Sequence, residues 1–206
     1  MKKTLFAAAV LAAFTFSSCS ENTSEKAEAT TEQHSTGKDR SIAESAVVVE
    51  APDFSSVAAP MKTQVAQLVE EYLKLTEALV ASEPAAAKTA ANDVLTVAKA
   101  MPVATLTTDE KAFAEEKTNT VIENASKIAE SEDLAVQRQN LEQLSETVFS
   151  MAKAFNAAEG TLYYQYCPMA FNNKGAYWLS SNEEIRNPYY GDAMLSCGTN
   201  EEIYKK

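Results

Sequence analysis

The sequence predicts an all-α fold, a four-helix up-down bundle that carries a small C-terminal module rich in glycine and tyrosine. Between residues 60 and 158, apolar residues recur at three- and four-residue intervals in four successive segments. This spacing places them on one face of each helix. From Gly160 the composition changes, because four of the five glycines, seven of the eight tyrosines and the only tryptophan lie between Gly160 and Lys206.

The four helical segments have recognisable boundaries. The first ends before Pro84, which suits the first turn of the second helix because no N–H is needed there. The second stops at Pro102, the third opens with the T-x-x-E capping box of Thr107–Glu110, and the fourth runs from Asp133 to Phe155. Four helices of about twenty residues with short connections can cover one another's apolar faces as a bundle.

Three methionines occupy helix-face positions, Met61, Met101 and Met151. We assign them to core packing, since methionine fills irregular gaps between helices. The helical region contains no histidine, so it cannot form the Glu-x-x-His pairs of a carboxylate-bridged di-metal site.

Residues 1–18 are predicted to be an export signal, with Lys2 and Lys3 followed by an apolar run from Leu5 to Phe16. The run of about a dozen residues is shorter than the ~20 needed to span a membrane. "FSSC" resembles a lipobox, which predicts acylation of Cys19 and anchoring to a membrane surface. The alternative is ordinary cleavage that leaves Cys19 as an odd thiol.

Residues 19–59 are predicted to form a disordered tether, because they are rich in Ser, Thr, Glu, Ala and Lys and poor in apolar residues. His34, the only histidine, lies inside this segment. Of the 18 basic side chains, Lys2 and Lys3 leave with the signal, so 16 basic face 29 acidic side chains, a formal charge of about −13. Such a surface repels nucleic acid.

Residues 159–206 are predicted to form a compact aromatic module. Leu162–Cys167 has the character of a short strand, Asn172–Gly175 that of a turn, and Ser181–Glu184 repeats the capping-box pattern of a helical turn. This module is too short for a robust core of its own, so we expect it to dock on the bundle.

The module contains two closely spaced sulfur pairs. Cys167 and Met169 would project to the same side of an extended segment, and Met194 and Cys197 are neighbours on a helical turn. Together these four residues form a candidate site for a soft ion such as Cu(I) or Ag(I). Tyr166, Trp178 and Tyr190 are candidates to shield such an ion from water and oxidant.

The alternative is a Cys167–Cys197 disulfide with no metal. A signal-bearing protein commonly enters an oxidising compartment, and two cysteines remain once Cys19 is acylated. Closing a loop of about thirty residues would stabilise the module by roughly 3.5 kcal/mol in the chain-entropy model. The spacing alone leaves both interpretations open, and the reduced form could bind copper while the oxidised form does not.

The C-terminal run from Tyr163 to Gly198 resembles the signature of a bacterial envelope domain family of unknown function. The resemblance rests on a Cys-Pro-Met motif, a Trp-Leu pair, an Asn-Pro-Tyr turn and a final Met-Leu-x-Cys-Gly, carried by Cys167, Pro168, Met169, Gly175, Trp178, Leu179, Ile185, Asn187, Pro188, Tyr189, Gly191, Met194, Leu195, Cys197 and Gly198. The family occurs as free-standing lipoproteins and fused to adaptor subunits of copper and silver efflux pumps. The resemblance therefore implies heavy-metal binding and an efflux adaptor as partner.

The function we expect is that of a monomeric lipoprotein of the bacterial cell envelope, facing the periplasm or the cell surface, which binds a soft ion for tolerance or delivery. The second hypothesis is a protein-interaction lipoprotein held together by the disulfide. We expect no enzyme, because histidine is absent outside the tether and no nucleophile–base motif occurs.

Overall fold

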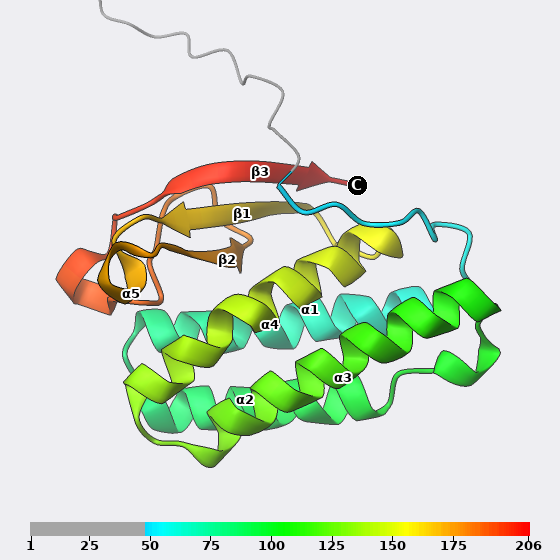
Figure 1. Ribbon diagram of the computed structural model, residues 1–206, viewed down its shortest axis with the longest axis horizontal. Helices are drawn as coiled ribbons and strands as arrows, with labels where there is room; N and C mark the ends of the chain where they lie inside the picture. The colour runs from blue at the N-terminus through cyan, green and yellow to red at the C-terminus, as the bar shows by residue number, and fades with distance from the viewer. Residues whose placement is uncertain (1–47) are drawn as a thin grey trace, which may run out of the picture. The chain divides into compact units, whose positions relative to one another are not determined.

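The computed structural model describes residues 48–206 (Figure 1). The predicted signal, Cys19 and residues 19–47 of the predicted tether lie outside the described residues. The described chain is mostly helical and ends in a small three-stranded antiparallel sheet. The all-α prediction is therefore right only in its coarser form, a mostly helical protein, because the aromatic module forms a complete sheet.

Each long helix packs against the next, and α4 also packs against α1. The bounds are α1 Ala59–Val80, α2 Pro84–Lys99, α3 Thr108–Glu130 and α4 Leu134–Ala154, with a short 3₁₀ turn η1 at Val103–Thr105. The expected helix starts are confirmed: Pro84 lies in the first turn of α2, and Thr107 and Glu110 form both bonds of a capping box. Asp133 caps α4 by accepting from the N–H of Ala135 at 2.8 Å.

The helices bury a continuous apolar core rich in alanine and leucine. The core assignment of the three helix-face methionines is confirmed, since Met61, Met101 and Met151 are at most 7 % exposed. Among the helices of residues 48–206, none combines the length and the apolar character needed to cross a membrane.

The sheet has the order β2-β1-β3, with β1 Thr161–Cys167, β2 Ala176–Ser180 and β3 Thr199–Lys205. The predicted strand is confirmed. The predicted helical turn at Ser181–Glu184 is wrong, because the segment has no helical residue. Instead Gln165 Nε2 donates to the carbonyl of Asn182 at 2.9 Å, and Asn200 Nδ2 donates to that of Glu183 at 3.0 Å. These two hydrogen bonds satisfy backbone carbonyls of the segment, which forms an irregular loop.

The outer edge of β2 is covered by side chains from the helices and from a nearby loop. The N–H of Leu179 donates to the Tyr72 hydroxyl at 3.1 Å, and Tyr72 is hydrogen-bonded to Ser145 of α4 at 2.6 Å. The Tyr189 hydroxyl donates to the carbonyl of Tyr177 on the same edge. These bonds close the edge against pairing with another strand.

Four aromatic rings form a column from α4 along the sheet. Phe149 stacks on Tyr164 with centroids 4.9 Å apart, Tyr164 stacks on Tyr177 at 4.9 Å, and Tyr177 contacts Tyr166 at 4.5 Å. Together with the edge bonds, this column fixes the position of the sheet on α1 and α4.

Replacing Tyr72 by phenylalanine is expected to lower the free energy of unfolding by about 1–3 kcal/mol, since it leaves the buried N–H of Leu179 without an acceptor. Urea denaturation of the variant and the wild type measures the loss. Thr147→Val is the matched control, because the hydroxyl of this buried threonine in α4 bonds the carbonyl of Gln143, one turn earlier in the same helix. A Tyr72→Phe variant as stable as the control would contradict this account of the edge.

Residues 48–58, which the sequence assigns to the tether, pack against the fold. Glu202 of β3 accepts from the N–H groups of Val48 and Val49 at 2.8 and 2.9 Å. Its second carboxylate oxygen is paired with Lys153 of α4. Phe54 extends this contact, because its ring packs at a tilt against that of Phe155 with centroids 5.9 Å apart. The folded part of the chain therefore begins by Val48.

Candidate functional site

The sheet register brings the two distant cysteines together. Cys167 is the last residue of β1, and Tyr166 pairs with Thr199 at the start of β3. Because the two strands are antiparallel, Cys197, two residues before Thr199, lies beside the end of β1. The two Sγ atoms are 2.9 Å apart, and both cysteines are free thiols in the structure, with Cys167 buried and Cys197 half-buried.

The loop after Cys167 has an unusual backbone. Phe171, Asn172 and Asn173 of the short α5 (Ala170–Asn173) have φ of 49°, 59° and 66°. Asparagine tolerates this left-handed region, whereas a bulky residue such as Phe171 rarely adopts it. The Tyr190 hydroxyl donates to the carbonyl of Met169 at 2.6 Å. This bond ties the start of the strained loop to the segment that leads to Cys197.

Asn187 organises the opposite loop. Its side-chain Nδ2 donates to the carbonyl of Cys197 at 2.8 Å, its N–H donates to the carbonyl of Leu195 at 2.8 Å, and its Oδ1 accepts from the N–H of Tyr189 at 2.8 Å. The side chain is fully buried. Asn187 therefore positions Cys197 through the backbone on both sides of η2 (Gly191–Met194).

Arg138 of α4 is a supporting residue that the sequence analysis missed. Its Nε donates to the carbonyl of Pro188 at 2.7 Å, and its Nη2 donates to the carbonyl of Leu79 and the hydroxyl of Ser82 at 3.1 and 2.9 Å. It thereby joins the Cys197 loop to the turn between α1 and α2. No local pattern marks it, since one arginine on a solvated helix face is common.

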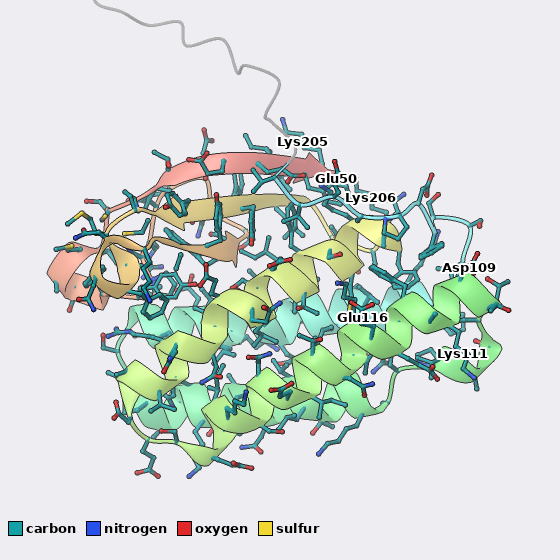
Figure 2. All side chains as sticks on the ribbon, in the orientation of Figure 1. Glu50, Asp109, Lys111, Glu116, Lys205 and Lys206 are labelled. Carbon is teal, nitrogen blue, oxygen red and sulfur yellow. The ribbon has the colours of Figure 1, made fainter. Side chains whose placement is uncertain are left out.

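The two methionines of the sulfur pairs are exposed. Met169 is 43 % exposed and Met194 39 %, whereas the three helix-face methionines are buried. Both lie close to Cys197 through the backbone: the N–H of Met169 is near enough to act on the pKa of the Cys197 thiol, and the N–H of Cys197 donates to the carbonyl of Met194 at 3.1 Å. Figure 2 shows sulfur atoms gathered at this end of the sheet, around α5.

The surroundings of Cys197 shift the pKa of its thiol. The hydrogen bond to Cys167, followed by burial, raises the pKa of the Cys197 thiol, and the N–H of Met169 opposes this shift. A raised pKa keeps the thiol protonated at neutral pH. An ion that binds Cys197 as thiolate must therefore displace a proton, so its binding weakens as the pH falls.

The donor set fits a soft ion. Two thiols and two exposed thioethers favour Cu(I) or Ag(I) over hard cations, and within residues 48–206 no three His, Cys, Asp or Glu side chains come together as a metal site. Metal–sulfur bonds of ~2.3 Å at a tetrahedral angle hold two sulfurs about 3.8 Å apart, and a disulfide holds them at about 2.05 Å. The observed 2.9 Å separation lies midway between these two distances. A movement of the sulfur atoms by about 1 Å or less therefore brings them either to the metal-bound or to the disulfide distance.

The three aromatic residues expected to shield the site differ in position. Trp178 is fully buried, and a Cβ on Gly198 would come within 2.8 Å of its ring, so residue 198 must be glycine for this close packing. Tyr166 lies closer still over Gly175, where a Cβ would come within 1.9 Å of its hydroxyl oxygen. Tyr190 reaches the site through its bond to Met169. All three therefore border the two loops that carry the sulfur atoms.

Comparison with known proteins concerns the helical part of the chain. Residues 68–160 match a family described as "Protein of unknown function (DUF3347)". The matched residues run from α1 to the residue before β1 and stop short of Cys167. No curated protein and no solved structure matches the chain. The chain is therefore similar, over its helices, to an uncharacterised domain family.

Proposed function

We propose that this protein is a lipoprotein of the bacterial cell envelope that binds a soft heavy-metal ion, Cu(I) or Ag(I), for metal tolerance or delivery to an efflux system. Cys167, Cys197, Met169 and Met194 hold the ion, and the four long helices, as an up-down bundle, serve as the scaffold. The ion is cargo, and no catalysis is involved. An efflux adaptor protein is the proposed recipient.

The exposure of Met169 and Met194 is the observation that carries this proposal. Methionine side chains that merely fill space beside a disulfide are expected to be buried, as the three helix-face methionines are. Here two exposed thioethers lie on the segments that carry two thiols whose Sγ atoms are 2.9 Å apart. An ion can reach the donors from solvent, and the strained 168–175 loop holds the Cys-x-Met segment in place.

The lipid on Cys19 is part of the proposal. Val48 lies 29 positions after Cys19, and a chain of this length spans at most about 100 Å when fully extended. The folded domain can therefore reach a partner well away from the membrane surface to which the lipid is attached.

A Cu(I) competition titration on the reduced full chain tests the metal site. Cys167→Ala is expected to weaken binding roughly a hundredfold and Met169→Leu about tenfold, because each removes one soft donor. Met151→Leu is the matched control, a fully buried methionine in α4, and should leave the affinity unchanged. Affinity that is indifferent to Cys167→Ala and Met169→Leu would overturn the proposal.

The second candidate function is a protein-interaction lipoprotein with a structural Cys167–Cys197 disulfide, which the short distance between the sulfurs also favours. A free-thiol count on protein isolated without reductant separates the two states. A value near zero indicates the bridge, and a value near two indicates an open dithiol site.

A further inference from the structure

A cavity on the side of the sheet that faces α4 has more acidic than basic side chains in its wall. Its volume is about 360 Å³, and its wall includes Glu142 and Glu146 of α4, Tyr164 and Tyr177 of the sheet, and Glu50 of the N-terminal segment. We call it the acidic cavity. It contains none of the four sulfur residues.

The two carboxylates of α4 lie one helical turn apart and repel each other. Neither forms an ion pair with any residue of the 48–206 region. Burial, and then the charge of Glu146, raise the pKa of Glu142. The one cation in the cavity wall, Lys117, is paired with Glu116 at 3.1 Å and lies 5.6 Å from the ring centre of Phe113.

Tyr164 supplies an independent observation. Its side chain is 2 % exposed, and among the hydrogen bonds of residues 48–206 its hydroxyl has no partner. Burial and the nearby charge of Glu146 raise its pKa, so the hydroxyl stays protonated. The ring is fixed between Phe149 and Tyr177. The hydroxyl is not one of the fully enclosed polar atoms that lack a partner, so it is accessible from the cavity that Tyr164 lines. A ligand that donates a hydrogen bond can bind it there.

We propose that the acidic cavity binds an organic ammonium group, with Glu142 and Glu146 as counter-charges and the Tyr164 hydroxyl as a hydrogen-bond acceptor. An ammonium group carries three N–H donors, enough for one bond to each carboxylate and one to the hydroxyl. A bare metal ion is a poorer match, because no cluster of three or more His, Cys, Asp or Glu side chains occurs in the described chain. The ammonium comes from a small free amine or from a lysine side chain of a partner.

Calorimetric titration of the full chain at low ionic strength and pH 7 tests this site. The probes are 1,5-diaminopentane for the free amine, the methylamide of Nα-acetyl-lysine for a protein side chain, and 1,5-pentanediol as a neutral analogue. We expect a Kd on the order of 1 mM for at least one of the two amines and no binding of the diol. The amine that binds more tightly identifies the source of the ammonium.

Variants locate the binding. Glu146→Gln and Tyr164→Phe are each expected to weaken amine binding about tenfold. Tyr164→Phe keeps the stacked ring and removes only an unpartnered hydroxyl, so the variant should fold normally. Glu130→Gln, which removes the same charge from an exposed site at the end of α3, is the matched control. Absence of amine binding, equal binding of the diol, or the same loss in Glu130→Gln as in Glu146→Gln overturns the proposal.

Discussion

Replacing Glu202 by alanine is expected to lower the free energy of unfolding by about 3–5 kcal/mol, because it leaves the Lys153 ammonium buried without its counter-charge. The two side chains are only 5 % and 14 % exposed. The same carboxylate accepts the N–H groups of Val48 and Val49. The substitution should therefore also release the N-terminal segment from β3.

Urea unfolding measures the stability loss, and hydrogen exchange at Val48 and Val49 reports the release of the segment. The double variant Lys153→Met/Glu202→Leu should recover most of the loss, since no unpaired charge remains buried. Glu123→Ala is the surface control: Glu123 pairs with Lys127 at 2.7 Å but is 65 % exposed, so its loss should stay below about 1 kcal/mol. Equal effects of the two single variants would contradict the prediction.

Replacing Phe149 by alanine is expected to cost about 3–5 kcal/mol, the range for removing a large buried aromatic side chain. Phe149 is fully buried and stacks on Tyr164 of β1, while Tyr204 of β3 packs edge-on against it with centroids 6.4 Å apart. It is the first ring of the aromatic column, so the cavity left by alanine opens directly between α4 and the sheet.

Thermal and urea unfolding test this prediction, with near-UV circular dichroism as a second readout. The tyrosine signal should change in Phe149→Ala, because Tyr164 loses one of its two stacking partners. Phe149→Leu keeps most of the volume and should lose clearly less stability. If Phe149→Ala unfolds like the wild type and keeps its near-UV spectrum, the column does not hold the sheet on the helices.

Local signals were enough to predict the helices. The three- and four-residue spacing, Pro84 at a helix start and the Thr107–Glu110 capping box act within a few residues, and the observed bounds follow them. The same capping-box pattern wrongly predicted a helical turn at Ser181–Glu184. There the side chains of Gln165 and Asn200 donate hydrogen bonds to the loop carbonyls. Contacts from residues distant in the sequence outweighed the local preference.

The tether boundary was misplaced for a similar reason. Val48 and Val49 end a short apolar run, Ala46 to Val49, inside a largely polar segment, and Glu202 holds them from more than 150 residues away. Arg138 and the acidic cavity were also invisible to sequence reasoning, because each depends on groups from several elements. By contrast Cys167, Met169, Met194 and Cys197 could be predicted from the sequence, because each of these cysteines has a methionine two or three residues away.

By itself, the sequence determined the mostly helical character, the helix boundaries and the two segments in which sulfur is concentrated, because periodicity, capping and composition are local properties. Only the tertiary structure decided that β1 lies between β2 and β3, and this order places Cys197 beside Cys167. It also decided that Met169 and Met194 face solvent rather than the core. Strand order and side-chain exposure depend on which faces pack together, and that is settled by contacts between residues far apart in the chain.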